Sequence, residues 1–141
     1  MKKKYLIVLA DYYKKISNGL LQSALKKISK KNDLKVIRVP GVFEIPITIS
    51  KNIKKFDAFL ALGCVIKGQT PHFDFISQAS TNAIMELSVI SKKPIGNGII
   101  TCLNMSQAKK RVKKGEEAAL AVISILSQKW DLIITQRIIL E

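Results

Sequence analysis

The chain has 141 residues, which is the length of a single domain that can enclose one hydrophobic core. Its apolar runs are shorter than the ~20 residues that a membrane span needs, and its N-terminus lacks a cleavage site, so we expect a cytoplasmic protein with no membrane partner. A formal net charge of +14 suggests a nucleic-acid partner, but the lysines recur in pairs along the whole chain, so we expect no nucleic acid and a solvated basic surface that favours anionic small molecules.

Four short apolar runs alternate with longer stretches of helical period. The runs predict strands at residues 5–10, 34–39, 56–62 and 95–101, and the stretches predict helices at 16–28, 46–53, 73–90 and 106–129. Gly115 is expected to kink or divide the last helix. The alternation predicts a three-layer α/β/α sandwich of the flavodoxin-like class, with a four-stranded, mainly parallel sheet in one domain over residues 1–141. The apolar tail at 131–141 has no predicted structure.

Ligands of such folds bind outside the carboxyl ends of the strands. That rule selects four loops, which read DYY, PGVFE, CVIKGQTPH and CLNMSQ in chain order. Within the third loop, Thr70 is expected to cap a helix and Pro71 to occupy its first turn, so that free backbone N–H groups bind an anion. His72 would lie beside that anion as a neutral imidazole that moves protons, although a histidine that only caps the helix fits the loop equally well.

The other chemical groups have two readings each. Glu44 either accepts hydrogen bonds from the hydroxyls of a ligand or caps the turn that contains it. The aromatic residues of ADYY either stack on a planar heterocycle or pack in the core. Cys64 and Cys102 lack the spacing of a zinc site, so we expect two buried thiols and no metal. Arg111 by itself reads as an ordinary surface residue.

Four stretches, ADYY, VPGVFEIP, LGCVIKGQTPHFDFI and PIGNGIITCLNMSQAKKR, resemble in their order the successive motifs of the lumazine synthase family. The resemblance implies condensation of 5-amino-6-(D-ribitylamino)uracil with 3,4-dihydroxy-2-butanone 4-phosphate to give 6,7-dimethyl-8-ribityllumazine, phosphate and water. It implies no metal and no organic cofactor. It also implies a homo-oligomer, either a pentamer or a sixty-subunit shell.

The resemblance further assigns roles to individual positions, with His72 as the residue that transfers protons. Tyr12 would stack on the pyrimidine, and Glu44 would accept hydrogen bonds from the ribityl hydroxyls. Arg111 would bind the phosphate in the site of the neighbouring subunit. The other implied residues are Val42 and Phe43 at the ribityl site, Cys64, Val65, Ile66 and Asn97 at the uracil, and Gln69 and Thr70 at the phosphate.

The chain departs from the family pattern in three places. Asn97 replaces a common aromatic residue, and Tyr13 replaces a common asparagine. The sequence after Arg111 is shorter than is usual in the family, so either Lys113 or Lys114 is a candidate to assist at the phosphate. A flavin- or pteridine-binding relative without the activity, and a basic structural or nucleic-acid-binding module, are the competing interpretations. Formation of a lumazine chromophore from the two substrates separates the enzyme from both.

Overall fold

The computed structural model describes residues 2–128, so the expected tail at 131–141 lies outside the described residues. Within that range no helix is both long enough and apolar enough to cross a bilayer. The elements in chain order are β1 (Lys4–Ala10), α1 (Lys14–Leu25), β2 (Asp33–Val39), the 3-10 helix η1 (Val42–Glu44), α2 (Ile45–Asn52), β3 (Ala58–Ile66), α3 (His72–Ser91), β4 (Ile95–Cys102), α4 (Met105–Lys110) and α5 (Lys114–Leu126).

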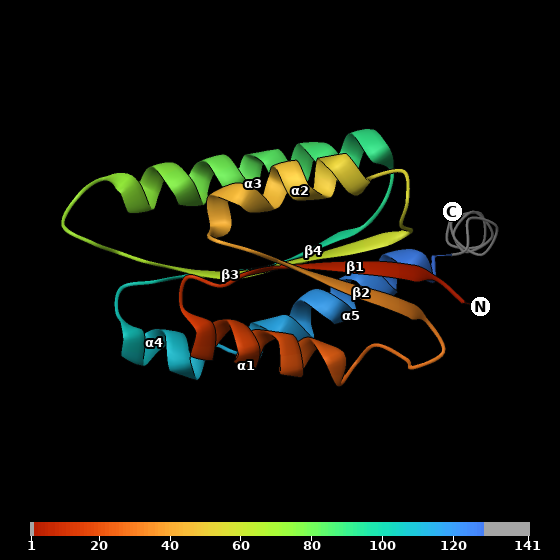
Figure 1. Ribbon diagram of the computed structural model, residues 1–141, viewed down its shortest axis with the longest axis horizontal. Helices are drawn as coiled ribbons and strands as arrows, with labels where there is room; N and C mark the ends of the chain where they lie inside the picture. The colour runs from red at the N-terminus through yellow and green to blue at the C-terminus, as the bar shows by residue number, and fades with distance from the viewer. Residues whose placement is uncertain (1, 129–141) are drawn as a thin grey trace, which may run out of the picture.

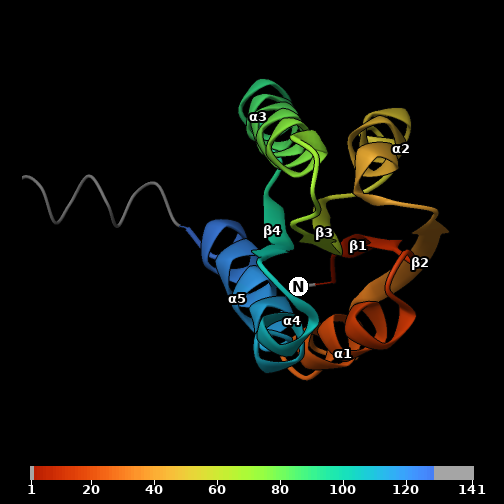
Figure 2. The same cartoon turned by 90° about the vertical axis from the view of Figure 1, so that its left-hand side faces the viewer.

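The four strands form one sheet in the order β2-β1-β3-β4, and every neighbouring pair is parallel. Helices α2 and α3 cover one face, while α1, α4 and α5 cover the other (Figure 1; Figure 2). The predicted three-layer α/β/α fold is therefore confirmed, with a sheet that is wholly rather than mainly parallel. The chain leaves β1 toward β2 and leaves β3 toward β4, so the strand order reverses between β1 and β3, where such folds bind their ligands.

Both faces of the sheet are buried, which explains why the strands read as continuous apolar runs. Alternate residues of β1 serve the two sides: Tyr5, Ile7 and Leu9 pack toward α1 and α5, while Leu6 and Val8 pack with α2 and α3. On β4, Gly96 allows α5 to approach closely, because a Cβ atom there would lie 2.4 Å from the carbonyl oxygen of Ala118.

Two element boundaries differ from the sequence-based expectation. Strand β3 continues to Ile66 rather than ending at Leu62, so residues 64–66 belong to a strand instead of a loop. The last helical stretch is divided at residues 111–113, and Gly115 lies inside α5. The first of these two helices is capped by Asn104, whose side chain accepts a hydrogen bond from the backbone N–H of Gln107 at 2.9 Å.

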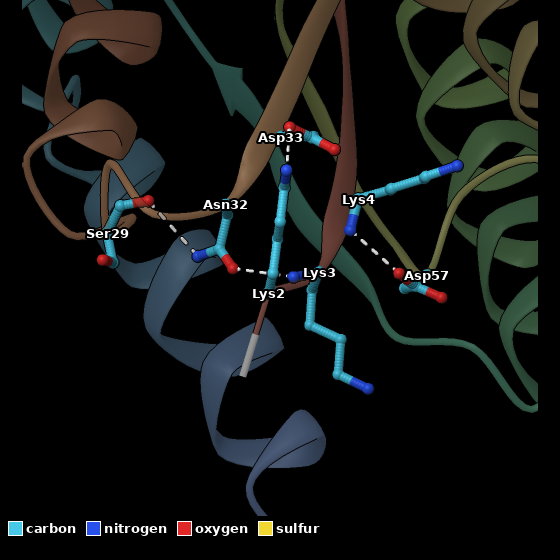
Figure 3. Close-up of polar contacts among 7 residues, drawn as sticks. All are labelled: Lys2, Lys3, Lys4, Ser29, Asn32, Asp33 and Asp57. Carbon is cyan, nitrogen blue, oxygen red and sulfur yellow. Dashed lines mark hydrogen bonds and ion pairs between the residues drawn. The ribbon is translucent and has the colours of Figure 1, made fainter.

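Side chains extend the hydrogen-bonding pattern at the amino end of the sheet (Figure 3). The Oδ1 atom of Asn32 accepts from the backbone N–H of Lys3 at 2.9 Å, and Oδ2 of Asp57 accepts from that of Lys4 at 2.8 Å. These contacts fix the register of β1 against the starts of β2 and β3.

Several lysine pairs lie at this same amino edge. Lysine pairs follow the ends of α1, α2 and α3 at residues 26–27, 30–31, 54–55 and 92–93, and residues 2–4 add three more. Roughly 20 Å of strand separates this edge from the carboxyl edge, whereas the Debye length in physiological salt is about 8 Å. Other lysines lie at the ligand-binding end, because Lys14, Lys15, Lys67, Lys109 and Lys110 follow the carboxyl ends of β1, β3 and β4.

Candidate active site

A cavity of about 610 Å³ opens at the carboxyl edge of the sheet, at the point where the strand order reverses. The loops after β1, β2 and β3 and the first turns of α3 form its walls. Nine residues singled out from the sequence line it, namely Tyr12, Val42, Phe43, Glu44, Cys64, Val65, Ile66, Thr70 and His72. Segments that lie as much as 60 positions apart in the chain therefore meet in one hollow.

Two tyrosines form the wall that follows β1. The rings of Tyr12 and Tyr13 meet edge to face with centroids 4.8 Å apart, and Tyr12 is 74% exposed. Burial raises the pKa of the Tyr13 hydroxyl, and its neighbours Tyr12 and Cys64 raise that pKa further. Tyr13 lines the cavity although the family pattern pointed only to Tyr12; two adjacent aromatic residues at the end of a strand were the available signal.

The wall after β2 is a short 3-10 turn that carries Glu44. Buried Val42 anchors the turn to the core, while Phe43 remains 69% exposed. The side chain of Glu44 makes no capping hydrogen bond to η1 or α2, and its backbone carbonyl accepts from the hydroxyl of Thr48 at 2.7 Å. Of the two readings of this carboxylate, capping is therefore wrong, and its oxygens are available to a ligand.

The end of β3 presents an unpaired backbone edge to the cavity. Strand β1 pairs with β3 only as far as Leu62, while β4 stays paired with β3 through Ile66. Among residues 2–128, the backbone of 64–66 consequently has no strand partner on its β1 side. Free amide and carbonyl groups on a strand edge can pair with a ligand that carries its own donors and acceptors, as a pyrimidine ring does.

Cys64 lies in this strand end and is buried beside Cys102. Burial raises the pKa of the Cys64 thiol to about 12, and the nearby Cys102 thiol adds to the effect. Cys64 is therefore a neutral thiol near neutral pH rather than a nucleophile. Within the described part of the chain, no three side chains of the metal-binding types come together.

The start of α3 forms the wall opposite β1 and β2. The hydroxyl oxygen of Thr70 accepts a hydrogen bond from the backbone N–H of His72 at 3.4 Å, and the carbonyl of Pro71 accepts from those of Asp74 and Phe75. Pro71 occupies the position before the helix rather than its first turn. Both Thr70 and exposed His72 line the cavity, at the positive end of a 20-residue helix.

Three expected site residues do not line the cavity of their own chain: Gln69, Asn97 and Arg111. Asn97 lies opposite Ala61 in the edge strand β4, and its Oδ1 accepts from the backbone N–H of Ile99 at 3.1 Å. Arg111 follows α4 on the far side of the sheet, and its Nη1 donates to the carbonyl of Thr101 at 3.3 Å.

The comparisons of this chain with known proteins all indicate the same family. The sequence model of the family described as 6,7-dimethyl-8-ribityllumazine synthase matches residues 2–129. A 6,7-dimethyl-8-ribityllumazine synthase of Cutibacterium acnes is 41% identical over 88% of this chain and 80% of its own length. The proteins of the same name from Bartonella tribocorum (40% identical, 93% of this chain, 96% of its own) and Bartonella bacilliformis (41%, 89% and 91%) are similar over most of both chains.

Proposed function

Because the chain belongs to the 6,7-dimethyl-8-ribityllumazine synthase family, we propose that the cavity at its carboxyl edge is where it carries out that family's reaction. The enzyme is a transferase of riboflavin biosynthesis. It condenses 5-amino-6-(D-ribitylamino)uracil with 3,4-dihydroxy-2-butanone 4-phosphate and forms 6,7-dimethyl-8-ribityllumazine, phosphate and water. The observation that carries the placement is that one cavity collects nine of the twelve residues expected at the site.

The ribitylaminouracil occupies the side of the cavity between β1, β2 and β3. Tyr12 stacks on the pyrimidine, whose polar edge pairs with the free backbone of residues 64–66. The uncommitted carboxylate of Glu44 accepts hydrogen bonds from the ribityl hydroxyls, and Val42 and Phe43 flank the chain of the sugar alcohol. An aromatic face, an amide edge and a carboxylate thus match the three parts of this substrate.

The phosphorylated substrate occupies the side of the cavity at α3. The positive end of this helix and the hydroxyl of Thr70 bind the phosphate. Gln69, which does not line the cavity of its own chain, is placed beside them by the family resemblance alone. Arg111 of the neighbouring subunit completes the site with a guanidinium that can grip a phosphate through two hydrogen bonds. By resemblance to the family, Asn97 lies near the heterocycle, where its amide can form a hydrogen bond.

His72 moves protons in this arrangement. The substrate amine attacks the ketone, a Schiff base forms, phosphate is eliminated, and ring closure completes the product. Each step transfers a proton, and His72 lies on the wall of the cavity that the two substrates share in this proposal. Holding two flexible reactants in one cavity contributes more than any side chain, since well-oriented reactions gain roughly 7–11 kcal/mol.

The enzyme assembles into a closed ring of identical subunits, a pentamer by resemblance to the family. Helix α3 supports this assembly, because only Ser80 and Ile84 of its 20 residues are buried, while Phe75, Met85 and Ile90 are between 64% and 72% exposed. Exposed apolar surface of this extent is typical of a subunit interface. A head-to-tail ring also brings Arg111 of one subunit within reach of the cavity of the next.

The location of the enzyme is the cytoplasm. Its two cysteines are free and buried, which suits a compartment that keeps thiols reduced.

Mixing the two substrates with the purified protein tests the function. Lumazine absorbance and fluorescence should appear faster than in the uncatalysed mixture. Binding of the lumazine without faster formation would support the inactive flavin- or pteridine-binding relative. Tight, steeply salt-dependent binding of DNA without turnover would support the nucleic-acid-binding module.

A further inference from the structure

The turn that carries Tyr12 is held at its start by an ion pair from the neighbouring strand. The guanidinium of Arg38, in β2, donates from Nη1 to Oδ1 of Asp11 at 2.8 Å and from Nη2 to Oδ1 of Asn18 at 3.2 Å. Asp11 is the residue directly before Tyr12, and Asn18 lies in α1. One planar side chain therefore ties together the ends of β1 and β2 and the first turns of α1.

Further hydrogen bonds bracket the same turn. The backbone N–H of Asp11 donates to the carbonyl of Val39 at 2.9 Å, which continues the β1–β2 pairing beyond the end of β1. Downstream, the backbone N–H of Ser17 donates to the carbonyl of Tyr13 at 2.9 Å, and its hydroxyl donates to the carbonyl of Ala10. Both ends of the turn are thus anchored.

The ring of Tyr12 depends on these anchors, because it has little packing of its own. Its side chain is 74% exposed and meets the ring of Tyr13 edge to face. In this ion pair the side chain of Asp11 is 22% exposed and that of Arg38 is 47% exposed, so only the acidic partner is partly shielded from water. A guanidinium that binds two acceptors at once holds its geometry better than a surface pair with a single contact.

We propose that Arg38 is a positioning residue for the ribitylaminouracil: through Asp11 and Asn18 it fixes the turn that presents Tyr12 to the cavity. This inference rests on the proposed function, since it takes Tyr12 as the ring that stacks on the pyrimidine. Arg38 does not line the cavity, so it acts on the substrate only through the turn. A lysine at this position cannot bind both acceptors in one plane, and it should restore the geometry only in part.

Steady-state kinetics of Arg38→Gln, with the second substrate held at saturation, tests the proposal. The KM for the ribitylaminouracil should rise about three- to tenfold, while kcat and the KM for the butanone phosphate stay within about twofold. Arg38→Lys should fall between Arg38→Gln and the wild type. Combining Arg38→Gln with Asp11→Asn should raise that KM no further, because both changes break the same contact.

A matched control removes an ion pair at the opposite edge of the sheet. Lys2 pairs with Asp33 at 3.3 Å, and Lys2→Gln should leave both KM values unchanged. An Arg38→Gln variant that melts at a lower temperature with unchanged KM values would overturn the proposal and leave Arg38 a stabilising role only. An equal rise in both KM values would also overturn it, because the whole cavity would then have shifted.

The Tyr12→Ala variant separates this proposal from the proposed function. If Tyr12→Ala leaves the KM for the ribitylaminouracil unchanged, the placement of that substrate fails and the positioning role fails with it. If Tyr12→Ala raises that KM but Arg38→Gln does not, the placement stands and the positioning role alone is overturned.

Discussion

The hydroxyl oxygen of Thr70 accepts a hydrogen bond from the backbone N–H of His72, the first residue of α3, at 3.4 Å. The side chain expected at the phosphate and the side chain expected to move protons are therefore held by one short turn. Because the phosphate is a leaving group in the reaction, the proposed roles of these two residues would couple anion binding to proton transfer through this turn.

Replacing Thr70 with valine should weaken binding of the phosphorylated substrate. Valine keeps the shape of threonine but loses the hydroxyl, and a hydrogen bond to a charged group contributes about 1.5 kcal/mol or more. The KM for the butanone phosphate should therefore rise about tenfold. Thr70→Ser, which keeps the hydroxyl, should stay near the wild type. A similar loss in both variants would assign the effect to the shape of the turn.

Replacing Arg111 with alanine should selectively weaken binding of the phosphorylated substrate, because the guanidinium is lost from the cavity of the neighbouring subunit. Equal amounts of Arg111→Ala and His72→Gln chains, unfolded and refolded together, should form rings in which about a quarter of the interfaces have both residues intact. Activity should recover toward that fraction, with mass measurement confirming mixed rings. Mixed rings no more active than the average of the two variants would place both residues in one chain's cavity.

Replacing Gly115 with alanine should destabilise the fold. Helix α5 crosses α1 so closely that a Cβ atom at Gly115 would lie 2.0 Å from the carbonyl oxygen of Leu20. Helix propensity alone predicts stabilisation by about 1 kcal/mol, whereas overpacking predicts a loss of about 1–3 kcal/mol. Urea unfolding decides the sign. Gly68→Ala is the control, since a Cβ atom there meets nothing within 4 Å.

The raised pKa of Cys64 should make stability depend on pH in alkaline solution. Burial, with a smaller effect of Cys102, raises this pKa from 9.0 to about 12. Between these values the unfolded chain has lost a proton that the folded chain keeps, so the free energy of unfolding falls by up to about 1.4 kcal/mol per pH unit. Below about pH 8 the effect vanishes.

Denaturant unfolding at a series of pH values measures this dependence. Cys64→Ala should lose stability less steeply than the wild type above about pH 9, because it lacks the thiol that titrates. Comparing slopes cancels the titration of the lysines, which both proteins share. Parallel slopes would contradict a buried, neutral thiol at this position.

Period and composition were enough to predict the four strands and the layered fold, since burial on both faces leaves a plain apolar signal. Two glycines lie near the boundaries that differ from expectation. Gly63 resembles the end of a strand, yet it allows close packing, because a Cβ atom there would lie 2.9 Å from the Cβ of Ala10. Gly115 likewise resembles a helix break, yet it lies inside α5 and allows close packing against α1. Close contacts between distant segments leave no local pattern in the sequence.

The candidate site was predictable only where its residues follow strand ends. The positions of Tyr12, Glu44 and His72 follow from the rule that ligands bind at carboxyl ends. The uncommitted state of the Glu44 carboxylate and the anchoring by Arg38 depend on side-chain geometry, which no periodicity encodes. Arg111 lies outside its own chain's cavity, so its role depends on an assembly that one sequence does not describe.

The rate of lumazine formation by His72→Gln tests the central claim most directly. With both substrates saturating and the chemical step shown to be rate-limiting, turnover should fall by roughly 10²-fold, the low end for general acid–base catalysis. Both KM values should change little, since binding groups elsewhere in the cavity remain. Unchanged turnover would contradict the account by removing His72 from the mechanism.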